Sequence, residues 1–458
     1  MVCDKISGDA TMSDCLPETS TNNSLFESVC DDDAKEVERL LRNGSDVNAS
    51  DDHGRTLALF AAAHRSLRVM RVLLKFRADV CISDQDDRTP LHFAARDGSV
   101  RCISMLLNAG SAIDAVESER KTALHWAAYN DNAKAVKRLV DGGASVNSTT
   151  AWIMSPLHAA ACNNCCKAAA ALLDANADIN DNAGIDPTIC RETALMMAAK
   201  IGHQSMVALL IAKGASLDVL NWSQETALSI AVANGHDEII QMLLNAHANT
   251  DAALHVAVRC DSQTKVDMML VNNANINDSH KRYPHNTVLH VVKSKEMANL
   301  LLQAGAKIDQ RNVQSFTPVH YLADCGAKID LLAFFVDQGA NINTRNSKKQ
   351  TFLSTALSHR EESFVRLLFS ANVEICSDDL DYCRNHEYRT RLFPMMKKEL
   401  EQRSRALLVE IALGLEQFDL PVLLVTEIFS QSNPNLWDEF VPSFHTQWEI
   451  GKAIKHWD

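Results

Sequence analysis

A period of 33 residues constrains the fold of this chain more than any other feature. A threonine or serine suited to capping a helix recurs 33 residues apart at Thr56, Thr89, Thr122 and Ser155. A fixed period of this length indicates a stack of identical supersecondary units, because one such unit cannot bury its apolar face alone. The sequence therefore predicts a repeat protein rather than the several globular domains expected of an ordinary chain of 458 residues.

The clearest unit starts at Asp86 and reads DDRTPLHFAARDGSVRCISMLLNAGSAIDA. Thr89 is expected to cap a first helix, with Pro90 at its first position, where a missing N–H costs nothing. Gly98 supplies the left-handed residue that ends this helix, and Gly110 ends a second, amphipathic helix. Each unit is therefore predicted to be two short helices followed by a projecting hairpin.

This unit closely resembles the ankyrin repeat, and the resemblance extends from about Ser24 to about Val373. The resemblance implies an all-α solenoid of helix-turn-helix units with β-hairpin fingers. The capping positions of eleven units are Asn23, Thr56, Thr89, Thr122, Ser155, Thr193, Thr226, Ala252, Thr287, Thr317 and Thr351. An insertion around Ile185–Cys190 enlarges one hairpin, whereas the unit at Ala252 has lost most of the hairpin before it. We expect a bend or slack joint near residues 250–300.

The departures from the period divide the chain into four regions. Residues 1–22 are expected to be a disordered N-terminal segment, and residues 23–249 to hold repeats 1 to 7. Residues 250–373 are expected to hold the irregular repeats 8 to 11. Residues 374–458 follow a different pattern and predict a C-terminal helical module.

Composition narrows the compartment and the class of partner. Thirteen scattered cysteines without framework spacing indicate a reducing compartment. The formal charge of −13 is spread over the repeats and repels phosphate backbones and anionic lipid, so we expect no nucleic-acid partner. No apolar run approaches the roughly 18 residues that span a bilayer. The acidic, Ser/Thr-rich stretch after Met1 is not expected to act as a leader peptide. We expect a cytoplasmic or nuclear protein without membrane insertion.

The resemblance implies other proteins as partners, held on a concave surface of hairpin tips and exposed ends of first helices. Large aromatic and arginine side chains dominate the energy of such interfaces. The expected partner-binding residues are Trp152, Trp222 and Tyr283 in hairpins and Arg96, Tyr129, Asn130, Lys200 and Asn234 near helix ends. The alternative is that each tryptophan folds back on its neighbour. Trp126 occupies a position that faces the stack, so we expect it in the core.

A cysteine and histidine cluster was tested against the register of the repeat. His158, Cys162, Cys165 and Cys166 have the spacing of a zinc site. In register, however, His158 is the routine histidine of the repeat and Asn164 takes the glycine position, so we expect no metal. No Walker loop, GxGxxG turn, HExxH helix or GxSxG elbow occurs. We therefore expect no enzyme, no catalytic residues and no cofactor.

Two hairpin asparagines, Asn48 and Asn180, stand in the strings DVN and DIN. They resemble sites used by the asparaginyl hydroxylase of the hypoxia pathway, and the resemblance implies hydroxylation. Asparagine in this position also bonds the turn backbone whether or not it is modified.

The tail carries two further resemblances. The string LPVLLVTEIF is similar to the opening helix of an F-box, which would dock on the Skp adaptor of a cullin ubiquitin ligase. Its expected adaptor-binding residues are Leu420, Pro421, Leu424, Ile428 and Phe429. The segment 406–415 resembles in part the elongin-binding helix of a SOCS box, with Ile411 where cysteine is expected. A structural cap on the last repeat is the alternative.

The sequence thus supports two functions that differ in what the tail binds. The first is a scaffold or adaptor that holds partner proteins on its concave ankyrin surface. The second is the substrate-recognition subunit of a cullin-RING ubiquitin ligase, with the repeats selecting the substrate and the tail recruiting a Skp or elongin adaptor.

Overall fold

The computed structural model divides into two compact units, Met1–Asn275 and Ile276–Asp458, called unit 1 and unit 2 below. The residues that the structure describes are 23–151, 154–182, 191–279, 285–346, 350–358, 362–371 and 373–374, with 398, 399 and 402. Within these ranges the regular structure is helical, as the repeat pattern predicted, and β-pairing is confined to isolated bridges. None of the helices in these ranges combines the length and hydropathy needed to cross a bilayer.

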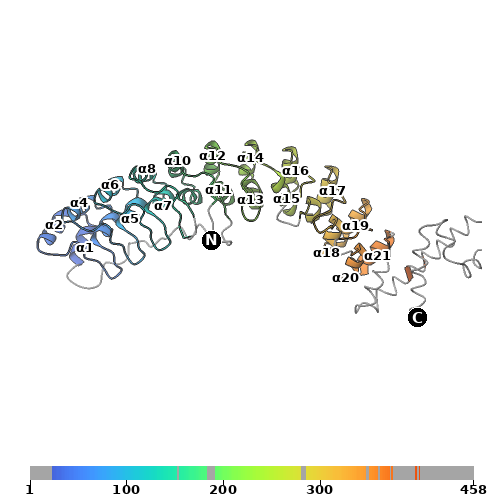
Figure 1. Ribbon diagram of the computed structural model, residues 1–458, viewed down its shortest axis with the longest axis horizontal. Coiled ribbons are helices and arrows are strands. Elements are labelled where there is room, and N and C mark those ends of the chain that lie inside the picture. Colours follow the sequence, from blue (N-terminus) through green and yellow to red (C-terminus); the bar gives the residue numbers. More distant parts are fainter. Residues whose placement is uncertain are drawn as a thin grey trace, which may run out of the picture. The chain divides into compact units, whose positions relative to one another are not determined.

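Unit 1 contains eight helical pairs, with the first helices in one row and the second helices in another (Figure 1). The first helices are α1 (Asn23–Cys30), α3 (Leu57–Ala63), α5 (Pro90–Arg96), α7 (Ala123–Tyr129), α9 (Pro156–Cys162), α11 (Ala194–Ile201), α13 (Ala227–Asn234) and α15 (Asp251–Arg259). The second helices are α2 (Ala34–Arg42), α4 (Leu67–Lys75), α6 (Val100–Asn108), α8 (Ala133–Asp141), α10 (Cys166–Asp174), α12 (Gln204–Ala212), α14 (Asp237–Asn245) and α16 (Gln263–Val271). Each first helix packs on the first helix of the next pair.

Unit 2 contains three further pairs in the residues described. They are η2 (Val288–Val291) with α17 (Lys295–Gln303), α18 (Pro318–Asp324) with α19 (Ile329–Asp337), and α20 (Phe352–Ser358) with α21 (Glu362–Ser370). The first of these helices is a single 3-10 turn because Val292 leaves the helical region, with φ −64° and ψ 149°. The predicted joint near residues 250–300 stays a prediction.

The capping positions expected from the sequence precede their helices, except Asn23, which is the first residue of α1, and Ala252. Thr89, Thr122 and Ser155 have extended backbones and precede α5, α7 and α9 as N-caps. The expected cap at Ala252 is wrong, because α15 begins at Asp251 and its N-cap is Thr250. The shortened loop before α15 had removed the landmarks that located the other caps.

Small residues on the first helices let neighbouring pairs approach closely. Ala94, Ala95, Ala127 and Ala128 are all fully buried, and larger side chains such as Leu106 fill the space between the rows. A buried leucine contributes about 1.5 to 3 kcal/mol relative to an exposed one. Because each pair shares its buried face with the next, the core runs continuously along a unit.

Aspartate at the turn between the two helices of a pair also caps a helix in the next pair. Asp131 has a φ of 53°, at the position that Gly98 fills with a φ of 69°. Its Oδ1 accepts the backbone N–H groups of Lys167 and Ala168 at the start of α10, both at 2.9 Å. Asp32 does the same for Arg68 and Val69 at the start of α4, both at 3.1 Å. These aspartates therefore join consecutive repeats.

Replacing Asp131 with glycine is expected to lower the free energy of unfolding by about 1 kcal/mol. Glycine keeps the positive φ without strain but leaves two N–H groups at the start of α10 without their acceptor. The matched control is Asp131→Asn, which tolerates the same backbone and retains an oxygen acceptor. Chemical denaturation of both variants checks this, and equal loss in both would show that the bond to α10 does not matter.

Candidate functional site

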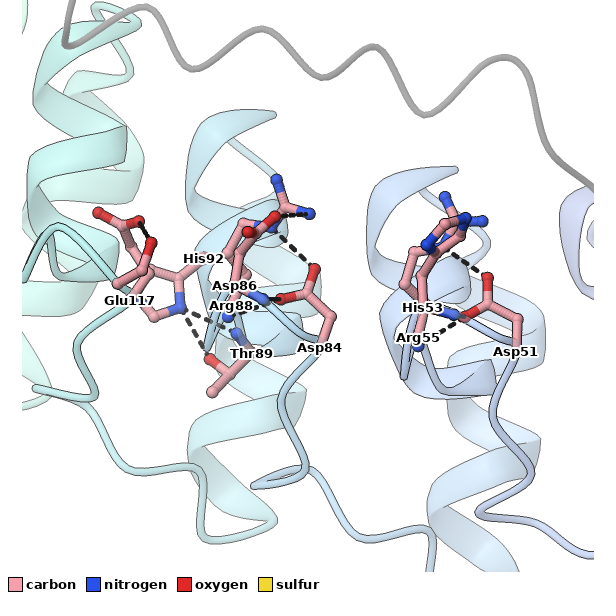
Figure 2. Close-up of polar contacts among 10 residues, drawn as sticks. Asp51, His53, Arg55, Asp84, Asp86, Arg88, Thr89, His92 and Glu117 are labelled. Atoms are coloured by element: carbon pink, nitrogen blue, oxygen red, sulfur yellow. Dashed lines mark hydrogen bonds and ion pairs between the residues drawn. The ribbon is translucent and has the colours of Figure 1, made fainter.

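Several of the loops that enter first helices form compact fingers built on one polar side chain. In the finger at residues 51–55, Asp51 Oδ1 accepts the N–H groups of His53 and Arg55 at 3.0 and 2.8 Å. Asp51 Oδ2 pairs with Arg55 Nε at 2.6 Å. The finger at 84–88 repeats this arrangement with Asp84 and Arg88, whose Nε lies 2.8 Å from Oδ2 (Figure 2). The fingers are thus rigid before any partner binds.

Neighbouring fingers are joined to one another by backbone hydrogen bonds. Gln85 donates its N–H to the His53 carbonyl at 3.1 Å, and Ser118 donates to Asp86 at 3.0 Å. Ala151 donates in the same way to Glu119 at 2.8 Å. The tips of consecutive fingers in the first five repeats therefore form one continuous ribbon along the edge of the stack.

In the repeats of α5, α7 and α9, a buried histidine joins the first helix to the following finger. His92 Nδ1 accepts from the Thr89 N–H at 3.1 Å (Figure 2). Its Nε2 lies 3.1 Å from the Lys121 carbonyl. Because a carbonyl only accepts, Nε2 carries the proton and the ring is neutral. Burial lowers the pKa of His92 and of His125 to about 4. With both nitrogens bonded, these imidazoles are structural and do not form general bases.

Arginine and aromatic side chains alternate where α5 and α7 meet. The Arg96 guanidinium lies 5.1 Å from the centroid of the Phe93 ring and 5.9 Å from that of Trp126. Arg96 also pairs with Asp97, at 3.2 Å between Nε and Oδ1. Trp126 is half-buried against Phe93, with ring centroids 6.1 Å apart. The Arg96 side chain is therefore only 27% exposed.

The other expected contact residues at helix ends line the same side of unit 1. Tyr129 is half-buried, whereas Asn130 is exposed and bonds the Trp126 carbonyl through Nδ2 at 2.9 Å. Lys200 is exposed and pairs with Glu192 at 2.7 Å, and Asn234 Nδ2 bonds the Ile230 carbonyl at 2.8 Å.

Trp222 is the one aromatic contact expected in a hairpin that the described residues include. Its residue is 52% exposed in the finger at 221–225. The Arg191 guanidinium, from the preceding finger, lies 5.6 Å from its ring centroid. Trp222 thus contacts its neighbour Arg191 and remains about half exposed. Trp152, Tyr283 and the tail residues Leu420, Pro421, Leu424, Ile428 and Phe429 lie outside the described residues.

The cysteine cluster has the structural role that the repeat register predicts. His158 bonds Ser155 through Nδ1 at 2.8 Å and the Glu192 carbonyl through Nε2 at 3.0 Å, so both nitrogens are engaged. Cys165 Sγ donates to the Tyr129 carbonyl at 3.0 Å, and burial raises its pKa to about 11. In the ranges described, no group of three or more ligating side chains is placed to hold a metal ion.

Asn48 and Asn180 belong to a row of side chains that bond the next repeat. Asn48 Oδ1 accepts the Asp79 N–H at 2.8 Å, and Asn180 Oδ1 accepts the Ser216 N–H at 2.8 Å. Asp114 fills the same position for Ser145 at 3.0 Å. The bond between repeats therefore needs only a side-chain oxygen, and hydroxylation of either asparagine stays a prediction.

Two residues beside Trp222 were not predicted from the sequence. Arg191 stacks on its ring, and Leu220 is 42% exposed next to it. The enlarged hairpin before Thr193 was visible in the spacing. Spacing does not give the distances between repeats. It therefore could not show that Arg191 reaches Trp222 in the following finger.

Comparisons with known proteins agree with this architecture. Residues 25–117, 109–183, 182–252 and 285–379 match the family model described as ankyrin repeats (3 copies). The putative ankyrin repeat protein FPV031 of fowlpox virus (strain NVSL) is 31% identical over 159 residues, which is 33% of this chain and 45% of that protein. The chain thus spans less than half of this relative. The solved ankyrin repeat domain of human ASB11 has a TM-score of 0.40 at 23% identity, covering 48% of this chain and 99% of that domain.

Proposed function

Because this chain belongs to the ankyrin-repeat family, whose members typically bind other proteins, we propose that it is a non-catalytic scaffold. It holds partner proteins on the side of unit 1 that carries the fingers and the ends of the first helices. One observation carries the proposal: this side presents Asn130, Lys200 and Trp222 on a framework that the Asp51 and Asp84 fingers and the buried histidines have already fixed.

Rigidity matters because ordering side chains and loops on binding reduces affinity. Immobilising one flexible side chain costs about 0.5 to 1.5 kcal/mol. Arg88 is held within its own finger by Asp84 at 2.8 Å, and the Arg96 guanidinium contacts the rings of Phe93 and Trp126. A partner therefore meets a surface in which most of this ordering is complete before contact.

Reversing charge on the finger side is expected to weaken capture of the protein that the intact chain retains best from a cell extract. Lys200→Glu combined with Asn130→Arg should lower its affinity roughly tenfold, because both side chains are exposed at first-helix ends. Lys137→Glu is the matched control, since Lys137 is exposed on the second helix α8. Loss of capture in the control alone would place the partner on the second-helix side.

The alternative function rests on the tail, residues 374–458. Under it, Leu420, Pro421, Leu424, Ile428 and Phe429 bind a Skp or elongin adaptor, and the repeats select a protein for ubiquitination. Comparing the intact chain with one that ends at Val373 separates the two functions. A cullin with its adaptor retained only by the intact chain supports the ligase role. The same partners retained by both, with no cullin, support the scaffold.

A further inference from the structure

The row of fingers in unit 1 is interrupted after the finger at residues 221–225. The N-cap Thr250 follows the N-cap Thr226 by 24 positions, whereas Thr122 follows Thr89 by 33. Residues 246–250 alone join α14 to α15, and they turn directly from one helix into the next. Among the described residues of unit 1, the finger at 221–225 therefore has no following finger.

This interruption leaves one backbone acceptor without its usual donor. The Ser223 carbonyl stands at the place of the His53, Asp86 and Glu119 carbonyls, each of which accepts an N–H from the next finger at 2.8 to 3.1 Å. No backbone N–H in the described residues bonds the Ser223 carbonyl. An unpaired backbone edge of this kind is a template for an added strand.

Two exposed apolar side chains lie on either side of Asn221 next to this acceptor. Leu220 is 42% exposed and Trp222 is 52% exposed. The stacked Arg191 guanidinium, 5.6 Å from the Trp222 ring centroid, restrains the ring. A large ring held in place offers contact area at little cost in conformational entropy, which is the property of strong interface residues.

The helix beneath the interruption lacks the histidine that would reach a following finger. Where His125 bridges to the Met154 carbonyl at 3.0 Å, α13 carries Ser229. Ser229 Oγ accepts the Thr226 N–H at 2.9 Å and bonds the Thr226 carbonyl at 2.9 Å, so it caps its own helix and reaches no further. Met196 replaces the histidine in α11 as well. The absence of the histidine therefore accompanies the interruption at α13 but is not unique to it.

We propose that an extended segment of a partner protein occupies the place of the missing finger. The segment donates a backbone N–H to the Ser223 carbonyl and packs an aliphatic or aromatic side chain against Trp222 and Leu220. The expected hydrogen bond follows the pattern of those between fingers, in which Gln85, Ser118 and Ala151 donate the equivalent N–H. Recognition is then strand addition, with the main-chain bond giving affinity and the apolar contact giving selectivity. The proposal rests on the scaffold function and names one class of ligand for it.

The probe for this site is a fluorescein-labelled peptide, STTAWIMSP, which copies residues 148–156 of the chain. It contains the Ala151 amide that bonds Glu119 in the chain, followed by an apolar pair. Fluorescence anisotropy with the intact chain should show saturable binding. Methylating the peptide nitrogen of Ala151 should weaken binding about fivefold, because it removes one hydrogen-bond donor.

Two substitutions in the chain distinguish binding at this site from nonspecific binding of the peptide. Trp222→Ala should weaken peptide binding roughly tenfold, as loss of an aromatic anchor does. Val116→Ala is the matched control, because Val116 is 45% exposed beside a finger whose Glu119 carbonyl is already bonded. It should change the affinity by less than about twofold. The far-ultraviolet circular dichroism of both variants should match that of the original chain, because both side chains are exposed.

Filling the interruption provides an independent test. Inserting IDAVESERK, the sequence of residues 113–121, between Asn249 and Thr250 restores the 33-residue spacing and should abolish peptide binding. Absence of saturable binding to the original chain, or equal binding by the Trp222→Ala variant or by the methylated peptide, would overturn the proposal. A partner that responds to Lys200→Glu with Asn130→Arg but not to Trp222→Ala would leave the scaffold function intact and reject this site alone.

Discussion

Lowering the pH from about 7.5 to about 5 is expected to remove about 2 kcal/mol of unfolding free energy for each buried imidazole. His92, His125 and His320 have pKa values lowered to about 4 by burial, against 6.5 when unfolded. Between these values the unfolded chain binds more protons than the folded chain. The stabilisation is therefore complete above pH 6.5 and is lost as the pH falls toward 4.

The acid-induced loss of stability should be uneven along unit 1, and this unevenness can be measured. Repeats built on α5, α7 and α9 carry histidine, whereas α11 and α13 carry Met196 and Ser229. Hydrogen exchange near pH 5 should therefore show earlier opening of α5 to α9 than of α11 to α14. His125→Ser copies the cap made by Ser229 and is expected to blunt the acid response locally. Uniform exchange along unit 1 would contradict the role of the imidazoles.

Phe93→Ala is expected to lower the free energy of unfolding by about 3 to 5 kcal/mol. The ring is 1% exposed and contacts Arg88, Arg96 and Trp126 from two consecutive repeats. Its removal leaves a cavity between α5 and α7 and frees the Arg96 guanidinium on one side. Denaturant unfolding measures the loss, and a red shift of the Trp126 emission reports the opened contact.

Phe93→Leu is the matched control because it keeps most of the buried volume and loses the ring. This variant is expected to lower the free energy of unfolding by about 1 to 1.5 kcal/mol. If the alanine variant were no less stable than the leucine variant, the cavity argument would be wrong. The loss of stability common to both variants would then come from the contacts of the Phe93 ring with Arg88 and Arg96.

Local rules explain why most of the fold could be predicted from the sequence. Thr89, Pro90 and Gly98 act on their own helix, so their positions locate it without knowledge of the neighbours. Thr250 was missed because the loop before it lacks the residues that mark a finger, and the cap was placed at Ala252 instead. The boundary of a helix is thus predictable only where the flanking turn keeps its usual form.

The contact surface was less predictable because it depends on side chains of adjacent repeats. Arg96 was expected to be an exposed contact residue, and its surroundings include Trp126, which lies 30 positions later in the sequence. Trp222 is exposed, and its stacking partner Arg191 comes from the preceding finger. The pairing of Asp51 with Arg55, by contrast, lies within one finger and recurs at Asp84 and Arg88. A pair of this kind, four positions apart within one finger, is predictable from spacing alone.

The caps that Asp32 and Asp131 provide point in one direction along the chain. Each aspartate belongs to the earlier repeat, and the helix that it caps, α4 or α10, belongs to the later one. Asn48 and Asn180 likewise accept N–H groups from the repeat that follows. Since a ribosome releases the N-terminal repeats first, every new second helix in this set emerges beside an acceptor that is already folded. The stack can therefore grow by templated addition, one repeat at a time, in the order of translation.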